Sequence, residues 1–460
     1  MRRPNRRPNY LELGDVANYE GHADYIIYKD GSNTKVLNGN TGVVDSTSTN
    51  STTAIQYAID ALATGGKLFI RAGAYAIGTA ITIDTDDLEI IGQKGAILTT
   101  TAAIHAIEIG TTRNANKCII SGFELEGNGT GTVGIYVKTM TRSYIRDMEI
   151  SSFTIWGIEL QALHSIYVTG CFIDGNGTLG TAPYSGGITV GHDGPPDYVC
   201  NATTIEDCVI ENNVTGIWVV TGVRIKIDKC TIEGQSKNGV VVDRQGVAAT
   251  LPTNIYISAY FEANNTSTSA TIYDIKVYGA TKNVEIANCY FVGTDVDYGV
   301  YAGAGGYAAC FSMHDCYFQS AGDNYFSLST MMGGHVWGNG FADTTPRSGI
   351  VLSHLTSAWF HDNDNLENIH PVAAAHSIRA TDRVLLVDAT GGVRTATLPS
   401  PTKYGEPYTV KKVDASGNAV IVSQYNTDTI DGAATVALAG QYDYVTVKSD
   451  GTNWWIIGQG

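Results

Sequence analysis

The chain has 460 residues and a formal net charge of −16 at pH 7, and it contains no basic run apart from RRPNRR near its N-terminus. A protein that binds nucleic acid needs a basic face to neutralise phosphates, so we expect no nucleic-acid partner. No apolar stretch is long enough to cross a bilayer, and the N-terminus lacks the apolar segment of an ordinary signal peptide. We therefore expect no insertion into a membrane.

Residues 1–40 carry no strong pattern and end in an apolar stretch that predicts a short β segment, so we interpret them as a stalk, a neck or a lead-in to the fold. The following segment predicts a helix over 51–64. Ser, Thr and Asn residues precede it, Ile55, Ala58, Ile59 and Leu62 recur at helical spacing, and a Gly-Gly pair ends it. The sequence KLFIRAGAYAIGTAITI that comes next alternates with a period of two, which predicts strands.

The capped helix followed by GG-K-L-F-I-x-x-G-x-Y-x-I resembles the opening of the pectate-lyase-like superfamily. Members of that superfamily are right-handed parallel β-helices, and they include polysaccharide lyases, polygalacturonases and many phage tailspikes. The resemblance implies an all-β chain in which a parallel β-helix with three strands per turn covers residues 41–372. The helix would close the exposed end of its first turn. A resemblance at the level of the fold names no substrate.

Between about residues 120 and 320 a short motif recurs, in which Asp, Asn or Gly is commonly followed by Cys, a hydrophobic pair and an acid. Its copies begin at residues 122, 147, 170, 207, 229, 259, 288 and 315. A repeat of this length is typical of a stacked solenoid, in which no single repeat buries its own apolar face. Asp147, Gly170, Asp207, Asn288 and Asp315 open their copies, and residues of these types tolerate the left-handed conformation of a tight bend.

Eight cysteines are present, and none forms a Cys-x-x-Cys pair. Five of them fall at one position of the repeat, which favours buried free thiols stacked from turn to turn over a zinc site or a disulfide framework. We predict no metal ligand set and no cofactor. A calcium ion is left open at an acidic column that follows the third strand and comprises Glu126, Asp174, Glu211, Glu233 and Glu262, although solvated acids are the simpler interpretation.

The solenoid period is lost after residue 372. Residues 373–460 contain short strands separated by turns, which predicts a small antiparallel β-sandwich. This region is similar to C-terminal domains of phage and virus tail proteins, and that similarity implies a role in trimerisation or in binding sugar.

In the polysaccharide enzymes that the chain resembles, the substrate groove lies along the outward face of the first strand of each turn. Alternation along that strand predicts an outward column at its third position, which contains Glu108, Tyr136, Glu159, Thr189, Trp218, Val241, Lys276, Tyr301, Ser327 and Val351. Lys138, Asp243 and Tyr278 stand in the next outward column. Aromatic, acidic and cationic side chains of this kind suit sugar rings.

Hydrolysis of a glycosidic bond requires two carboxyl groups, and carboxylates two turns apart are separated by about 10 Å at the backbone. Glu108 and Glu159 form one such pair. Asp193 and Asp243 form another, which we favour as the catalytic pair because long insertions surround it. For each of these acids the alternative is a solvated surface charge. The predicted substrate-binding residues lie around the two pairs and are Tyr136, Lys138, His192, Trp218, Arg244, Lys276, Tyr278 and Tyr301.

A lyase would instead need a cation beside a uronate carboxylate and a base to remove a proton. Candidates for those roles are His192, Arg244, Lys276 and Tyr278. The sequence Arg224-Ile225-Lys226 is similar to an element of polygalacturonases, but the other elements of that family are missing and the predicted register places it on the second strand. We interpret Arg224 and Lys226 as surface charges.

These observations lead to the hypothesis of a tailspike-like homotrimer that cleaves a cell-surface or extracellular polysaccharide. It would be located on a virion or outside the cell. Glycoside hydrolysis is the first expectation, and elimination on a uronate polymer is the alternative. A non-catalytic adhesin or structural spike of the same fold remains the rival from another class.

Overall fold

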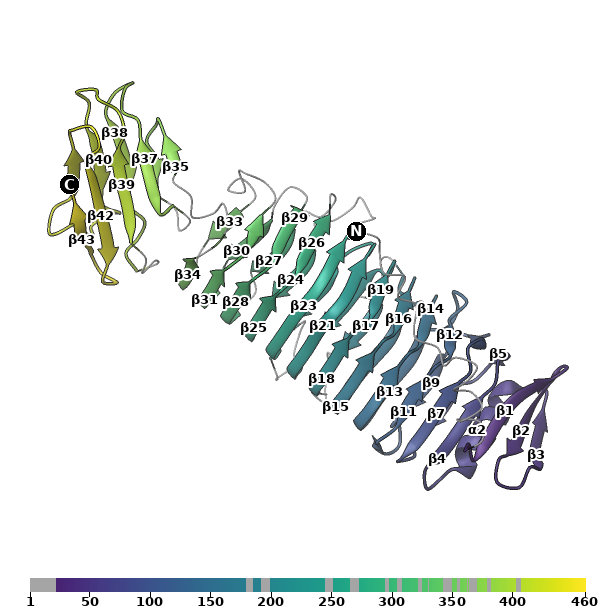
Figure 1. The fold of residues 1–460 in the computed structure, drawn as a ribbon. Coiled ribbons are helices and arrows are strands. Elements are labelled where there is room, and N and C mark those ends of the chain that lie inside the picture. The colour runs from purple at the N-terminus through teal and green to yellow at the C-terminus, as the bar shows by residue number, and fades with distance from the viewer. Residues whose placement is uncertain are drawn as a thin grey trace.

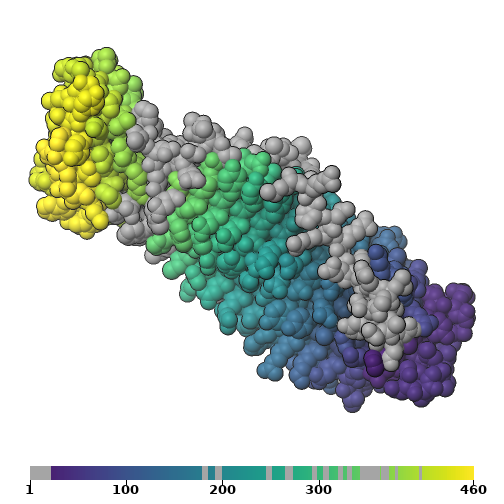
Figure 2. All heavy atoms as spheres, viewed as in Figure 1, coloured from purple at the N-terminus to yellow at the C-terminus, as the bar shows by residue number. Residues whose placement is uncertain are grey.

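The computed structural model describes residues 22–460 apart from a set of short segments. Those segments are 179–184, 192–198, 245–250, 265–272, 294–297, 304–307, 322–324, 330, 342–349, 354–355, 362, 364–369, 379–381 and 403–406. In the described part, strands stack along one axis, from the purple N-terminal elements at one end to the green ones near the other (Figure 1). The space-filling view shows the same elongated form (Figure 2).

The chain enters the solenoid through three antiparallel strands and one helix. The strands are β1 (Tyr25–Asp30), β2 (Asn33–Asn38) and β3 (Val44–Ser48). The helix α2 (Ser51–Ala61) starts at Asn50, whose side chain accepts a hydrogen bond from the backbone N–H of Thr53, and it buries Ile55 and Ile59 against the first turn. Strand β1 also pairs in parallel with the first solenoid strand, so the described part of the predicted lead-in is built into the fold. Residues 1–21 lie outside the described residues.

Each solenoid turn contributes strands to three parallel sheets, as predicted. Sheet one contains the outward column that the sequence assigned to the groove. Its strands are β6 (Ile81–Ile83), β9 (His105–Ile109), the first parts of β13 (Val133–Arg146) and β15 (Trp156–Thr169), β17 (Gly186–Val190), β20 (Thr215–Val219), β22 (Val240–Asp243), β24 (Tyr273–Tyr278), β27 (Tyr298–Gly303), β30 (Phe326–Ser329) and β33 (Ile350–Ser353).

Sheet two follows sheet one in every turn. Its strands are β4 (Gly66–Ile70), β7 (Leu88–Gly92), β10 (Ala115–Asn116), β11 (Ile119–Ser121), the later parts of β13 and β15, β18 (Asn201–Glu206), the first parts of β21 (Val223–Glu233) and β23 (Thr253–Glu262), β25 (Thr281–Ala287), β28 (Ala308–His314), β31 (Met331–Trp337) and β34 (Thr356–His361).

Sheet three carries the repeated motif of the sequence. Its strands are β5 (Gly73–Ile77), β8 (Ala96–Thr100), β12 (Glu124–Glu126), β14 (Glu149–Ser151), β16 (Phe172–Asp174), β19 (Val209–Glu211), the last parts of β21 and β23, β26 (Tyr290–Gly293), β29 (Tyr317–Ala321) and β32 (Gly340–Phe341).

Apolar side chains from all three sheets fill one continuous core. Seven of the eight cysteines are buried and all eight are free, while Cys310 is exposed. The predicted stack of thiols is therefore confirmed. Phenylalanines form a similar internal ladder in sheet three, where the rings of Phe261, Phe291, Phe318 and Phe341 follow each other at centroid distances of 5.1, 4.5 and 5.2 Å.

Two bends in each turn use residues with positive φ. The bend before sheet three has the left-handed residues predicted from the repeat, with φ near 53° at Asp147, Asp207 and Asp315. A second left-handed column lies near the start of sheet two over nine successive turns, and the sequence did not predict it. It consists of Asp87, Lys117, Arg142, Ser165, Ala202, Arg224, Asn254, Asn283 and Cys310.

A ladder of buried amides joins the turns after sheet three. The Asn213 side chain accepts hydrogen bonds from the backbone N–H of Asn176 at 2.9 Å and from its side-chain amide at 3.0 Å. Its own amide donates to the carbonyls of Ile173 and Glu211. The ladder continues through Gln235 to residue 264 of the next turns, so polar groups buried inside the bend are paired.

The C-terminal region forms two sheets around one apolar core. One sheet contains β35 (His370–Val372), β37 (Val384–Val387), β39 (Tyr408–Lys412), β42 (Tyr444–Ser449) and β43 (Trp454–Gln459). The other contains β36 (His376–Ser377), β38 (Arg394–Thr397), β40 (Val420–Ser423) and β41 (Thr435–Leu438).

The sandwich is confirmed, but its predicted antiparallel order holds only for its last strands. Strands β35 to β40 alternate between the two sheets, so neighbours within one sheet are two strands apart in the sequence and run parallel. Only the pairings of β41, β42 and β43 are antiparallel. Alternating apolar residues are compatible with both directions, which is why the sequence pattern did not separate them.

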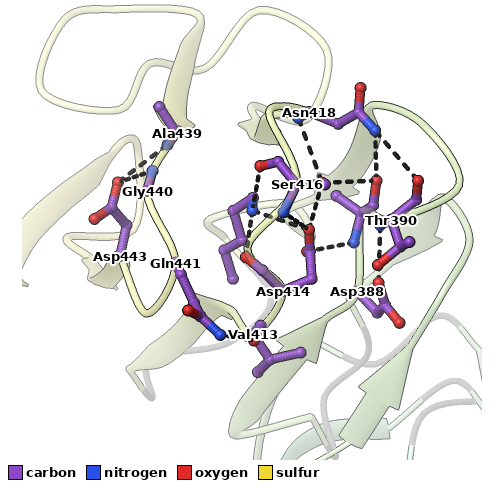
Figure 3. Close-up of polar contacts among 12 residues, drawn as sticks. Asp388, Thr390, Val413, Asp414, Ser416, Asn418, Ala439, Gly440, Gln441 and Asp443 are labelled. Atoms are coloured by element: carbon purple, nitrogen blue, oxygen red, sulfur yellow. Dashed lines mark hydrogen bonds and ion pairs between the residues drawn. The ribbon is translucent and has the colours of Figure 1, made fainter.

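A fully buried lysine organises one loop of this region. Figure 3 shows Asp414 and Ser416 of that loop. The ammonium of Lys412 donates to the carbonyl oxygen and a carboxylate oxygen of Asp414, at 2.5 and 3.0 Å, and to the carbonyl of Ser416 at 3.0 Å. Hydrogen bonds from Ser416, the Ala389 backbone N–H and Lys412 hold the pKa of Asp414 well below its usual range. The three ammonium donors are thus satisfied, as a buried charge requires.

Candidate functional site

The outward column of sheet one has the register that the sequence predicted. Backbone pairing places Glu108 beside Tyr136, Tyr136 beside Glu159, and Glu159 beside Thr189. The same column continues through Trp218, Val241, Lys276, Tyr301, Ser327 and Val351. The predicted groove residues of the described chain therefore share one face of the solenoid.

Glu108 and Glu159 lie two turns apart on this face, with Tyr136 between them. The Glu108 side chain is 31% exposed, and one of its carboxylate oxygens is 3.3 Å from Nδ1 of His105. The His105 ring lies against Tyr136, with ring centroids 4.6 Å apart. Glu159 accepts a hydrogen bond of 2.9 Å from the Gln161 side chain. Glu159 therefore has a hydrogen-bonded polar neighbour, whereas the His105 nitrogen near Glu108 makes no hydrogen bond with any described residue. Both carboxylates are partly exposed.

The two carboxylates lie on either side of Tyr136 in the same outward row. Strands in adjacent turns lie about 4.8 Å apart, so these two residues are about 10 Å apart at the backbone. Inverting glycosidases hold their carboxyl groups about 6.5 to 9.5 Å apart, and side chains of this length can span the difference. Lys138 is beside this row, where its ammonium donates to the Thr111 carbonyl at 3.3 Å.

An apolar cluster adjoins this row toward the C-terminal end of the solenoid. Trp156 and Trp218 stack at a centroid distance of 6.1 Å and are 4% and 5% exposed. Tyr136 packs against the same cluster. Because so little of Trp218 is exposed, its ring offers no open face for sugar stacking in this structure, unlike the role that the sequence predicted for it.

The carboxylate pair that the sequence favoured is only partly described. Asp193 and His192 lie outside the described residues, so nothing is said of their placement. Asp243 stands in the predicted outward column beside Tyr278, but it is only 2% exposed. Arg244 is half-buried, and its Nε has no hydrogen-bond partner among the described residues.

Lys276 lies among four half-buried tyrosines on the same face of sheet one. Its ammonium is 5.7 Å from the ring centroid of Tyr273 and 4.9 Å from that of Tyr278. The Tyr273 ring in turn contacts Tyr301 at 4.8 Å and Tyr298 at 5.9 Å. Burial lowers the pKa of Lys276, and the charge of Asp243 opposes that shift. This group can bind a sugar ring and supply a base.

The remaining predictions concern sheets two and three. Arg224 and Lys226 lie on sheet two, as predicted, and are exposed.

The acidic column forms one row on sheet three, in which Glu126, Ser151, Asp174, Glu211, Glu233 and Glu262 are successive backbone neighbours. Among the described residues no group of three or more His, Cys, Asp or Glu side chains has a geometry that could hold a metal ion. In that same part of the chain, no helix has the length and apolar character of a membrane span.

Sequence reasoning missed a hollow of about 430 Å³ on sheet two. Residues from five consecutive turns line it, and they include Tyr167, Thr204, Arg224, Lys226 and Tyr256. The sequence did contain a signal, because tyrosines recur at the outward position of the second strand. The family resemblance places the groove on the first strand, so this recurrence on the second strand led to no prediction.

Comparisons with known proteins identify the fold. A family model described as the right-handed beta helix region matches residues 102–255. The solenoid is a right-handed parallel β-helix. A search of curated proteins finds no match to the chain.

Several solved structures are similar to this chain. The A-module of a mannuronan C-5 epimerase from Azotobacter vinelandii has 15% identity and a TM-score of 0.50, over 68% of this chain and 91% of that one. A protein of Geobacillus virus E2 has 12% identity and a TM-score of 0.47, over 98% and 89%. The tailspike protein of an Acinetobacter phage has 13% identity and a TM-score of 0.44, over 90% and 77%. At these identities the likeness concerns the fold.

Proposed function

We propose that this β-helix cleaves glycosidic bonds of an extracellular polysaccharide by inverting hydrolysis, with Glu108 and Glu159 as the catalytic pair. The observation that carries the proposal is the row Glu108, Tyr136 and Glu159 on three successive turns of sheet one. It joins two surface carboxylates at a spacing suited to inversion with an aromatic ring between them. The pair of Asp193 and Asp243 is the less favoured alternative, because Asp243 is nearly fully buried.

The two carboxyl groups have different neighbours, and we use this difference to propose a separate role for each. The Gln161 amide donates to Glu159 and stabilises a carboxylate there, so Glu159 acts as the general base that removes a proton from the attacking water. Glu108 is the general acid and gives its proton to the leaving glycosidic oxygen. His105 lies 3.3 Å from Glu108 and can return a proton to it after the reaction. The C–O bond formed by water replaces the one that breaks, on the opposite face of the sugar.

The wider biological assignment belongs to the same proposal. An enzyme of the same fold is named for its action on mannuronan, a polysaccharide. We infer that the chain works as a homotrimer on a virion or outside a cell, in the manner of a tailspike, and that the C-terminal sandwich serves trimerisation or sugar binding. Sedimentation at several concentrations tests the trimer, and a monomer at all of them would overturn it.

The catalytic assignment is tested by replacing each acid with its amide. Glu108→Gln and Glu159→Gln are each expected to lower kcat by at least about a hundredfold on a polysaccharide that the wild-type protein degrades. Glu126→Gln on sheet three is the matched control and should leave kcat unchanged. Proton NMR of the first product should show the inverted anomer. Full activity in both amide variants would overturn the assignment.

A second candidate function is β-elimination on a uronate polymer, and Lys276 is the observation that favours it. Its lowered pKa increases the fraction of neutral amine, which can remove the proton beside the uronate carboxylate while the C–O bond to the leaving sugar breaks. Tyr278 and Tyr301 are close enough to the same ring cluster to protonate the leaving oxygen. Products with the ultraviolet absorbance of an unsaturated uronide, lost in Lys276→Met, would establish elimination and exclude hydrolysis at Glu108 and Glu159.

A further inference from the structure

We propose that the hollow on sheet two is a second, non-catalytic binding site for an acidic oligosaccharide. It is formed by β15, β18, β21, β23 and β25, which lie next to one another in Figure 1. The catalytic row of the proposed function lies on sheet one. Binding at the hollow therefore does not depend on the catalytic proposal, and it can be measured in an inactive protein.

The shape of the hollow follows from the local backbone. One wall consists of the left-handed residues near the start of sheet two, which include Ala202, Arg224, Asn254 and Asn283. The other wall is the first outward column of sheet two. That column holds tyrosine at Tyr167 and three turns later at Tyr256, whereas the turn next to Tyr167 has the short side chain of Thr204.

The length of the hollow suits a short segment of a sugar chain. Three turns correspond to about 14 Å along the solenoid axis. Within that column Thr204 leaves an open position beside Tyr167, and Lys226 stands next to Tyr256. A sugar unit in an extended chain advances by about one turn of the solenoid, so the open part accommodates about two units. Tyr144 stacks on one face of Tyr167 at a centroid distance of 4.9 Å and holds that ring in place. A fixed tyrosine ring is a suitable surface for a pyranose.

The polar groups of the hollow favour a carboxylate on the ligand. The exposed guanidinium of Arg224 makes no hydrogen bond or ion pair with any described residue, so its donors remain for a ligand. Arginine binds carboxylates through two parallel hydrogen bonds. Lys226 stands on the same strand, 2.8 Å from Asp228 and 6.0 Å from the Tyr256 ring centroid.

Two other polar residues that line the hollow, an acid and an amide, already have partners within the protein. Glu285 at its far end is 3.0 Å from the His314 ring, so this acid is held away from Arg224. The Asn283 amide donates to the Asn254 side-chain oxygen at 2.7 Å, and no described residue accepts from the Asn254 amide. That amide can donate to a sugar hydroxyl. The site thus combines one uncompensated cation with a ring and a neutral donor, inside a protein whose net charge is −16.

The test is direct binding to the full chain carrying both Glu108→Gln and Glu159→Gln. The probes are a hexameric oligogalacturonate and cellohexaose, each titrated by calorimetry. We expect the acidic hexamer to bind and the neutral one to bind at least about tenfold more weakly. Binding of the acidic hexamer should weaken further as salt is raised, because the ion pair with Arg224 is at the surface.

Substitutions locate the binding in the hollow. Arg224→Gln should weaken binding of the acidic hexamer by about tenfold and remove the preference over cellohexaose. Lys229→Gln is the matched control, since Lys229 is also exposed and left-handed but lies in the bend before sheet three. Tyr167→Ala should weaken binding, whereas Tyr317→Ala, an exposed tyrosine of sheet three, should not.

The Tyr167→Ala truncation could disturb folding, so a second variant that fills the hollow provides an independent test. Thr204→Trp adds volume at an outward position without touching the core, and we expect it to abolish binding while the thermal unfolding temperature stays the same. The proposal is overturned if neither hexamer binds, if both bind equally, or if Arg224→Gln and Thr204→Trp leave the affinity of the acidic hexamer unchanged. None of these outcomes depends on whether Glu108 and Glu159 are catalytic.

Discussion

Asp274 is a buried acid whose position favours its neutral form. It is 1% exposed, and burial raises its pKa from 3.8 to about 7. One carboxyl oxygen accepts a hydrogen bond of 2.7 Å from the Asn264 amide, while the other has no hydrogen-bond partner among the described residues. Asp274 therefore caps the buried amide ladder as a protonated acid.

The raised pKa of Asp274 predicts how the stability of the solenoid depends on pH. Between 3.8 and about 7 the folded chain binds a proton at this site that the unfolded chain has lost, so stability falls as the pH rises through this range. Each unit of the shift corresponds to about 1.4 kcal/mol. Asp274→Asn mimics the neutral acid and should raise the thermal unfolding temperature at pH 8 but not at pH 4. Asp60→Asn on the exposed face of α2 is the control, and an equal effect of Asp274→Asn at both pH values would contradict the assignment.

The cysteines predict a simple pattern of chemical reactivity. Burial raises the pKa of Cys118 to about 11 and that of Cys200 to about 12, which keeps those thiols protonated. Cys310 is the exposed thiol of the set. A thiol reagent should label one cysteine in the native protein and eight after denaturation, and Cys310→Ser should abolish the native labelling. Rapid native labelling of two or more thiols would contradict the buried stack.

At the scale of the element, the amide ladder is the interaction that joins successive bends. Asn213→Ala removes an acceptor for two donors of Asn176 and a donor to the Ile173 carbonyl. Because each buried polar group left unpaired costs about 1 to 3 kcal/mol, we expect a loss of about 2 to 4 kcal/mol in the free energy of unfolding.

Asn212 provides the control for this prediction. It is the neighbouring residue, it is exposed, and it has a φ of 55° that glycine also adopts. Chemical denaturation of Asn212→Gly should therefore give a change of less than about 1 kcal/mol. If the two variants lose the same stability, the ladder contributes nothing beyond the bend itself.

The strands of the solenoid show what the sequence can predict and where it cannot. Period-two alternation fixed the outward column from Glu108 to Val351, because a slip of one residue would move every apolar side chain out of the core. The left-handed column near the start of sheet two was not predictable in this way. It contains Lys117, Arg142 and Arg224, which carry none of the Gly or Asn preference that marks such bends.

The candidate site was predictable only in part, because the sequence pattern predicts strand register but does not predict exposure. Strand register depends on backbone pairing and was correct, so Glu108, Tyr136 and Glu159 were found on one row. Exposure depends on packing outside the solenoid core, and the alternation of a strand contains no information about it. The burial of Trp218 and Asp243 and the hollow beside Arg224 therefore required the structure.

At the scale of the whole molecule, the end of the solenoid must be covered. Helix α2 packs on the first turns and buries Ile55, which is 1% exposed, so its removal would leave sheet edges open to pairing with other chains. Ile55→Glu places a charge in this contact and should produce aggregates that light scattering detects. Tyr57→Glu on the same helix, at a residue that is 41% exposed, should remain dispersed. If the Ile55→Glu protein stays dispersed and keeps a native circular dichroism spectrum, the helix is not needed to cap the solenoid.

We propose that the carboxylates of one row on sheet one cleave a polysaccharide. The release of reducing ends from a panel of bacterial surface polysaccharides can be measured for the wild-type protein, Glu108→Gln and Glu159→Gln. The wild-type protein should release reducing ends from at least one glycan, each amide variant should lose at least about a hundredfold of this activity, and Glu126→Gln should keep all of it. Cleavage that survives in both amide variants would contradict this proposal.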